Sequence, residues 1–128
     1  MTYVADDEAW PLCVDTMSGH ATDAEVERYN ARRAQRLARE EPHVQIVDAR
    51  GAERMNADQR RRIADFNRDH RDAQAAWVAG VAFISDSTVI RGVLQAIYWR
   101  HPPPYPTAVF DELDAAMRWA RARLAERG

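Results

Sequence analysis

Short runs of apolar residues, separated by polar turns, predict five β-strands along the chain. The first two runs flank Asp6-Asp7-Glu8, an acidic segment typical of a hairpin turn. The next two runs are short and rich in β-branched residues, as buried parallel strands are. The predicted strands cover residues 2–5, 11–17, 44–47, 81–84 and 108–110.

Longer segments with apolar residues at helical spacing predict about four helices. The first helix begins at a capping box, Thr22 followed by Glu25, and ends at Pro42. Residues 73–76 are expected to be a link between the second helix and the strand that follows it. The predicted helices cover about 22–41, 56–70, 87–101 and 111–127.

The predicted helix 87–101 is expected to pack on the sheet through its apolar face, and three consecutive prolines end it. Gly92 lies in its interior, where glycine costs about 1 kcal/mol relative to alanine, so we expect Gly92 to allow a close approach to the sheet. The apolar face contains Ile90, Val93, Leu94, Ile97 and Tyr98. The predicted core consists of Val81, Phe83, Ile84, Val93, Leu94, Ile97, Val109 and Leu113.

The order of these elements predicts an α/β fold. The succession of strand, helix and strand over 81–110 is a parallel βαβ unit with a right-handed crossover. The whole chain is a hairpin followed by αβαβαβα, which gives a mixed five-stranded sheet covered by about four helices. With 128 residues it is expected to be a single domain, 1–128.

Composition and charge argue against several classes of function, namely nucleic-acid binding, membrane insertion and export. A formal net charge of -2 argues against general affinity for nucleic acid, although all 18 basic residues are arginines. No apolar run approaches membrane-spanning length and no signal pattern is present, so neither membrane insertion nor export is expected. The lone Cys13 is predicted to be a small buried residue in a reducing compartment, which indicates a cytoplasmic protein.

Three segments resemble the STAS and SpoIIAA-like domains, which are named for sulfate transporters and anti-sigma-factor antagonists. They read GVAFISDSTVIRG, AIYWRHPPPYPTAVF and LDAAMRWARARL, and the N-terminal WPLCVDTMSG is similar to the family's second strand. The resemblance covers roughly two-thirds of the chain and rests mostly on packing features. It implies a STAS-like fold and a non-catalytic protein-interaction module in bacterial signalling or regulation.

One loop departs from the family pattern. In anti-sigma-factor antagonists the loop after the central strand carries a phosphorylated serine, with an aspartate two residues before it. Here Asp48 matches that aspartate, and Arg50 stands at the position of the serine. The usual phosphorylation switch is therefore expected to be absent, and a relocated phosphosite would be at Ser85, Ser87 or Ser18.

The ends of two neighbouring strands form a candidate ligand or anion-binding corner. Its residues are Asp48, Arg50, Ser85, Ser87 and Arg91. The carboxyl ends of parallel strands gather ligands, and a helix N-terminus suits phosphate groups. The alternatives are structural: Asp48 and Arg50 form a pair that fixes the loop, and the serines cap the helix.

A second candidate site follows the helix 87–101. Trp99, His101, Pro103 and Tyr105 combine large aromatic side chains with a stiff proline segment, which is typical of a partner-binding surface. Trp99 is turned away from the apolar face of its helix. The alternative is that Trp99 covers the edge of the core, packed with Trp77 or Trp119.

The leading function is thus docking of a protein partner or a second copy. The alternative is a small-ligand carrier or sensor, for a lipid or nucleotide, that uses the strand-end corner or an apolar gap under the helix 87–101. An enzyme is not expected, because the sequence contains no nucleophile elbow, phosphate loop or dinucleotide fingerprint. The four histidines are too widely spaced to indicate a metal site, and no cofactor is expected.

Overall fold

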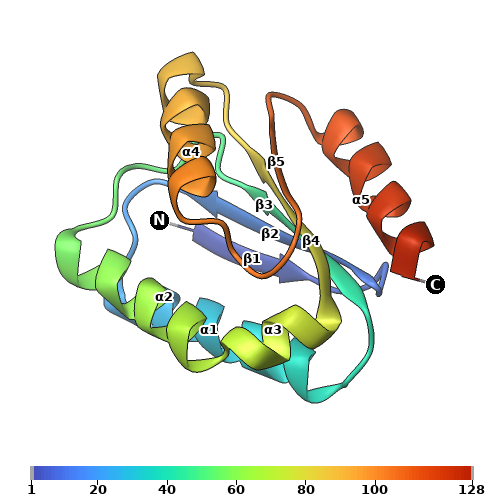
Figure 1. Cartoon of the computed structure of the whole chain (residues 1–128). Coiled ribbons are helices and arrows are strands. Elements are labelled where there is room, and N and C mark those ends of the chain that lie inside the picture. The colour runs from blue at the N-terminus through green and yellow to red at the C-terminus, as the bar shows by residue number, and fades with distance from the viewer. Residues whose placement is uncertain (1, 128) are drawn as a thin grey trace.

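The computed structural model describes residues 2–127, which form a five-stranded sheet with helices on both faces (Figure 1). The elements are β1 (Thr2–Asp6), β2 (Leu12–Ser18), α1 (Asp23–Ala38), β3 (His43–Asp48), α2 (Ala57–Asp69), α3 (Arg71–Trp77), β4 (Val78–Ile84), α4 (Thr88–Arg100), β5 (Thr107–Phe110) and α5 (Leu113–Arg127). The predicted α/β fold and the five predicted strands are confirmed. The predicted link at 73–76 is wrong, because these residues belong to α3, so the described chain has five helices and not four.

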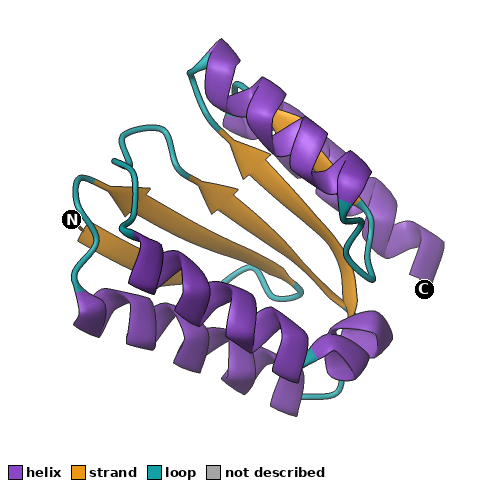
Figure 2. Ribbon diagram, turned by 60° about the vertical axis from the view of Figure 1, so that its left-hand side comes forward, coloured by secondary structure: helices purple, strands orange, loops and turns teal. Residues whose placement is uncertain are grey.

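The strands lie in the sheet in chain order, β1-β2-β3-β4-β5. β1 and β2 are antiparallel, and the three following pairs are parallel. Every crossover therefore advances one strand in the same direction, and right-handed crossovers then place α1, α2, α3 and α4 on one face. α5 lies on the opposite face (Figure 2).

Local signals in the sequence fix where the helices begin. Thr22 accepts a hydrogen bond from the Glu25 backbone, and the Glu25 side chain accepts one in return, so the predicted capping box is present. Asn56 and Gln59 form a second box at the start of α2. Ser87 caps α4 by accepting a hydrogen bond from the Ile90 backbone at 3.2 Å.

Alternating side chains of the sheet build two hydrophobic cores. In β3, Val44 and Ile46 face α5, whereas Val47 faces α1 and α2. All six residues of β3 are buried because helices cover both faces. Cys13 is fully buried, as its apolar neighbours predict.

The predicted packing of the helix 87–101 is wrong. Ile90, Val93 and Ile97 are 49%, 53% and 47% exposed, and among the described residues of α4 none is buried. Leu94 is half-buried, and so are Phe83, Val109 and Leu113, whereas Val81 and Ile84 are fully in the core. Tyr105, from the loop after α4, packs against the core on this face. The apolar face of α4 is therefore free of the sheet over most of its length.

The close approach predicted at Gly92 is also wrong. A Cβ atom built on Gly92 would have no described atom within 4 Å. Gly80 in β4 has that role instead, because a Cβ there would lie 2.8 Å from Trp119 Cη2 and 3.2 Å from Arg123 Cγ. The absence of a side chain at Gly80 lets α5 lie directly on the sheet.

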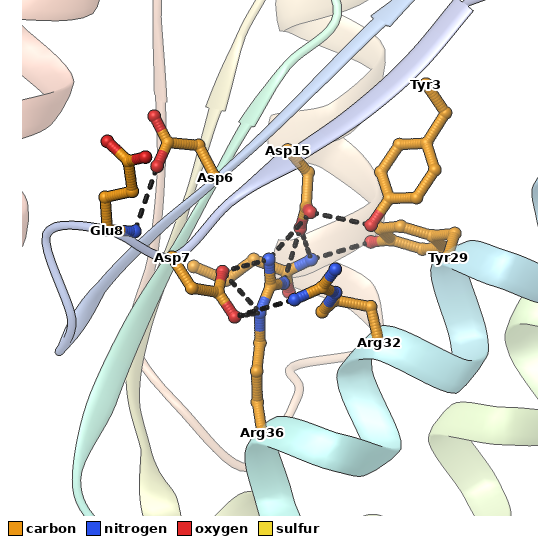
Figure 3. A network of polar contacts seen from close by, with 9 residues as sticks. Tyr3, Asp6, Asp7, Glu8, Asp15, Tyr29, Arg32 and Arg36 are labelled. Carbon is orange, nitrogen blue, oxygen red and sulfur yellow. Dashed lines mark hydrogen bonds and ion pairs between the residues drawn. The ribbon is translucent and has the colours of Figure 1, made fainter.

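A buried polar network connects α1 to the first three strands (Figure 3). Arg36 is 2% exposed and donates to both carboxylate oxygens of Asp15 at 2.8 and 2.9 Å, and to Asp7 at 2.7 Å. Asp15 also accepts from the Tyr3 hydroxyl at 2.9 Å and from Gln45 Nε2 at 2.7 Å. Both buried charges are thus neutralised and hydrogen-bonded, as burial requires.

We predict that Gly80→Ala destabilises the protein by about 1–3 kcal/mol, because the new methyl overlaps the Trp119 ring. Urea unfolding measures the change. Gly92→Ala is the matched control: it adds a methyl into open space on a helix and should stabilise by up to about 1 kcal/mol. Equal effects of the two substitutions would contradict the close packing of α5 on β4.

A pH dependence follows from His43, which is buried and stacked on Trp10. Burial lowers the pKa of His43, so the unfolded chain takes up a proton below pH about 6.5 while the folded chain does not. The contribution of His43 to the free energy of unfolding is therefore complete above that pH. It falls as the pH decreases, by at most about 1.4 kcal/mol per pH unit for one proton. We expect His43→Gln to lose less stability than the wild type between pH 7.5 and 5 in urea titrations. Parallel slopes for the two proteins would disprove this.

Candidate functional site

The predicted anion-binding corner is occupied by its own side chains. Arg50 donates to Asp48 through Nη2 at 2.7 Å and Nε at 2.9 Å, and its backbone N–H adds a third bond at 3.2 Å. The hydrogen bonds and charge of Arg50 hold the pKa of Asp48 below its usual value, against the effect of burial. The structure thus brings the two residues together as a pair that fixes the loop after β3.

The neighbouring serines also have local partners. Ser85 is buried, and its hydroxyl accepts from the Ser87 backbone at 3.2 Å. Arg91 turns back from α4 and donates to the Ser85 carbonyl at 2.6 Å. Of the two serines, Ser87 caps α4 through its bond from the Ile90 backbone, as the structural alternative expects, while Ser85 fixes the turn before the helix. Binding of an anion or phosphorylation at this corner stays a prediction.

The structure places three of the four predicted partner-binding residues, His101, Pro103 and Tyr105, around one cavity, whereas Trp99 lies outside that cavity. Trp99 is 84% exposed and His101 is exposed, whereas Pro103 is half-buried. Tyr105 is half-buried and packs against the core. The alternative that Trp99 covers the core is wrong, because Trp77 packs against one core and Trp119 against the other, and neither packs with Trp99.

The outer side of α4 is an apolar surface. We call it the α4 surface and define it by its exposed large side chains, Val89, Ile90, Val93, Ile97 and Trp99. A hollow of about 610 Å³ lies at its C-terminal end, beside Val93 and Trp99. The sequence of α4 contains no acidic residue. Of its two arginines, Arg100 lies beside the hollow and adds positive charge to this side, whereas Arg91 turns back to the Ser85 carbonyl.

The inner side of α4 borders a cavity of about 800 Å³, which we call the α4 cavity. Its floor is formed by side chains of β3 and β4, and its walls by α1, α2, α3, α4 and the proline loop. The lining residues are Tyr29, Arg33, Gln45, Ile63, Ala64, Asn67, Arg68, Arg71, Gln74, Val81, Phe83, Ile97, Tyr98, Arg100, His101, Pro102, Pro103, Pro104 and Tyr105. This volume is in the range of small-molecule sites. The gap predicted under the helix 87–101 is present.

Two polar residues of this cavity, Arg33 and Gln45, are not among the candidate site residues predicted from the sequence. Arg33 lies four residues after Tyr29 and four before Leu37, so helical spacing places it on the buried stripe of α1. Gln45 stands inside an apolar strand in which every residue is buried. Each of the two residues has a polar side chain at a position that the hydrophobic pattern predicts to be buried. That mismatch was the signal by which the sequence could have indicated them.

Comparison with known proteins relates this architecture to solved structures. No family model matches the sequence, and neither does any curated protein. An uncharacterised protein of the DUF3478 family from Shewanella loihica, described as having a SpoIIAA-like fold, superposes with a TM-score of 0.73 at 14% identity, covering 93% of this chain and 92% of that one. The fold is SpoIIAA-like.

The same fold is found in an anti-sigma factor antagonist from Mycobacterium paratuberculosis. It superposes with a TM-score of 0.57 at 16% identity, over 94% of this chain and 93% of that one. The resemblance noted in the sequence is therefore confirmed for the fold. Among residues 2–127, the SpoIIAA-like chain has no helix with the length and apolar character to cross a membrane.

Because Trp99 is almost fully exposed, we predict that Trp99→Ala changes the free energy of unfolding by less than about 0.5 kcal/mol. Trp77→Ala is the matched control, since Trp77 packs against the core and its loss should cost about 2 kcal/mol or more. Denaturant unfolding of both variants gives the comparison. A Trp99→Ala effect as large as that of Trp77→Ala would place Trp99 in the core.

Proposed function

We propose that this protein is a non-catalytic binding module of bacterial signalling or regulation that docks a protein partner on the α4 surface. The proposal rests on the exposure of the apolar side chains of α4. The largest of them, Trp99, lies near the C-terminal end of the helix and is 84% exposed. An apolar helix face of this kind exposed to water is unfavourable unless a partner covers it. Trp99 supplies the large area that dominates binding hot spots.

The loop after α4 favours tight docking. Pro102, Pro103 and Pro104 restrict the backbone next to Trp99, so little conformational entropy is lost when a partner binds there. Of the four interface residues predicted from the sequence, Trp99 and His101 are exposed, whereas Pro103 and Tyr105 are half-buried. The contact is expected to extend from them along α4.

The charge of α4 indicates the kind of partner. Arg100 lies on the docking side of a helix that has no acidic residue, so an apolar partner surface with a carboxylate rim is complementary. A second copy of α4 would bring no carboxylate to this arginine. We therefore assign the surface to a different protein.

The similar fold of an anti-sigma factor antagonist supports a regulatory role and a cytoplasmic location. Regulation would not use the serine of that family's loop, because Arg50 occupies its position and is paired with Asp48. Ser87 and Ser18 are the remaining candidates for phosphorylation, since Ser85 is buried whereas Ser18 is exposed. A phosphate at Ser87 would lie at the N-terminus of α4, where the helix dipole tolerates negative charge.

Photo-crosslinking in the native cell tests the proposal. We expect a benzoylphenylalanine at position 93, on the α4 surface, to form one discrete adduct with another protein, and Trp99→Ala in the same chain to remove it. A benzoylphenylalanine at the exposed position 61 of α2 is the control and should give no such adduct. Similar adducts from both positions would refute docking through α4, and an adduct of twice the chain mass would identify a homodimer instead of a different protein.

A second candidate function is the binding of a small molecule in the α4 cavity. The observation that favours it is the cavity itself, about 800 Å³ with an aromatic lining and polar side chains from α1 and α3. Ligand sites are typically concave, mostly apolar and equipped with a few polar groups. Both functions would use α4, and they would share Ile97, Arg100 and His101, which border both the hollow beside Trp99 and the α4 cavity.

A further inference from the structure

Arg33 is a buried cation without a counter-ion. It is 7% exposed, and no carboxylate oxygen among the described residues lies within 4 Å of its guanidinium. Its hydrogen bonds go to two neutral amides: Nη1 donates to Asn30 Oδ1 at 3.2 Å, and Nη2 donates to Asn67 Oδ1. A buried charge that lacks an opposite charge is unfavourable, so this arrangement needs an explanation.

Arg36, on the same helix, shows how the chain accommodates a buried arginine with a structural role. Two carboxylates, Asp7 and Asp15, neutralise it and accept its hydrogen bonds. Arg33 lies one turn earlier and faces the α4 cavity instead. The two arginines therefore differ in what their guanidinium groups face: Arg36 faces two carboxylates, and Arg33 faces the α4 cavity.

The lining of the cavity is positively charged. The exposed Arg68, Arg71 and Arg100 mark its entrance, and the described residues that line it include no aspartate or glutamate. Arg68 is paired with Asp65 and Asp69 on its own helix. An anion entering the cavity would therefore meet cations from α1, α3 and α4 without facing a carboxylate.

Neutral polar groups complete the site. Gln74 is 3% exposed and lines the cavity, and its Oε1 has no hydrogen-bond partner within the described part of the chain. The hydroxyls of Tyr98 and Tyr105 likewise make no hydrogen bond to any residue from 2 to 127. Burial raises the pKa of both tyrosines, so their hydroxyls stay protonated and can donate.

The lining includes four aromatic rings, those of Tyr29, Phe83, Tyr98 and Tyr105, beside aliphatic residues and the three prolines. Phe83 and Tyr98 are in contact, with ring centroids 5.7 Å apart and an angle of 36° between them. The Arg33 guanidinium lies over the Tyr29 ring, 5.0 Å from its centroid, and on its way to the cavity it also lies over Phe66, which is not part of the lining, at 4.3 Å. Such walls favour a flat, ring-containing molecule over a flexible chain, because aromatic surfaces stack in offset or tilted pairs.

We propose that the α4 cavity binds an aromatic carboxylate, with Arg33 as the residue that holds the carboxylate. The inference rests on the second candidate function and names its ligand class. The carboxylate accepts hydrogen bonds from the N–H groups of Arg33 that its two amide partners leave free, and from the tyrosine hydroxyls. Gln74 Oε1 accepts from a hydroxyl or N–H substituent on the ring. One buried cation matches one negative charge, which favours a carboxylate over a doubly charged phosphate.

Calorimetric titration with 2-naphthoate and with uncharged 2-naphthamide tests this proposal. The two probes have nearly the same shape, so a difference in affinity reports the charge. We expect the wild type to bind 2-naphthoate roughly ten-fold or more tightly than 2-naphthamide. This is the ratio typical of hydrogen bonds to a charged group. Arg33→Met should abolish this preference and Arg33→Lys should retain part of it, whereas Arg68→Met, at a paired arginine of the entrance, should retain it. Thermal unfolding of each variant verifies its fold.

If Arg33→Met does not fold, a second variant that removes only the Tyr105 hydroxyl still tests the proposal. Tyr105→Phe removes a single donor from the cavity and should weaken 2-naphthoate several-fold while 2-naphthamide is little changed. Equal affinities of the wild type for the two probes would overturn the proposal, as would an unchanged preference in folded Arg33→Met. Uptake of the uncharged dye Nile red, blocked by Ala64→Trp at the lip of the cavity, reports the cavity itself. Dye uptake without a preference for 2-naphthoate would refute only the ligand class, and absence of binding by every probe would refute the second candidate function as well.

Discussion

The buried ion pair between Arg36 and Asp15 is the interaction on which the arrangement of α1 and the sheet depends. Asp15 is fully buried in β2 and also accepts hydrogen bonds from Tyr3 in β1 and Gln45 in β3, so one carboxylate connects three strands to a helix. A pair of this kind contributes little net stability, since desolvation offsets most of its attraction. Its geometry instead fixes the position of α1. Gln45 also donates to the Tyr29 hydroxyl at 3.0 Å, and both residues line the α4 cavity. The network that positions the helix thus also positions one wall of the site.

The two faces of the sheet are used differently. On one face α5 packs closely, with Gly80 against Trp119, and the second core contains small and medium apolar side chains. On the other face α1, α2 and α3 pack on the sheet, but α4 contacts it mainly at the edge, near β5 and Phe83. The binding surfaces that we propose belong to the element with the least packing, as is common for functional parts of a stable scaffold.

The sequence predicted what depends on local chemistry. The capping box at Thr22, the cap at Ser87 and the buried strand that contains Val81 were all correct, because neighbouring residues determine them. The Asp48–Arg50 pair, two residues apart, was also foreseen as the structural alternative.

The predictions that failed depend on contacts across the chain. The apolar stripe through Val93 and Ile97 indicates a face that avoids water, but not whether the sheet or a partner covers it. Similarly, the sequence does not show which glycine meets a bulky side chain, and Gly80 meets Trp119, 39 positions away. The counter-ions of Arg36 come from the hairpin that precedes its helix, so helical spacing alone could mark it as buried but could not distinguish it from Arg33.

The strand order has a consequence for how the chain folds. Because the strands lie side by side in the order of the sequence, each new strand can add to the edge left by the preceding one, without insertion between strands that have already paired. Such neighbouring additions keep loop-closure costs low and favour folding that proceeds from the N-terminal hairpin onward. The face that α5 covers is the exception, since Val44, Ile46 and Ile84 keep an exposed apolar surface until the last helix in chain order arrives. In a chain that folds in this order, that face is open to water and to aggregation until α5 packs on it and brings Trp119 against Gly80.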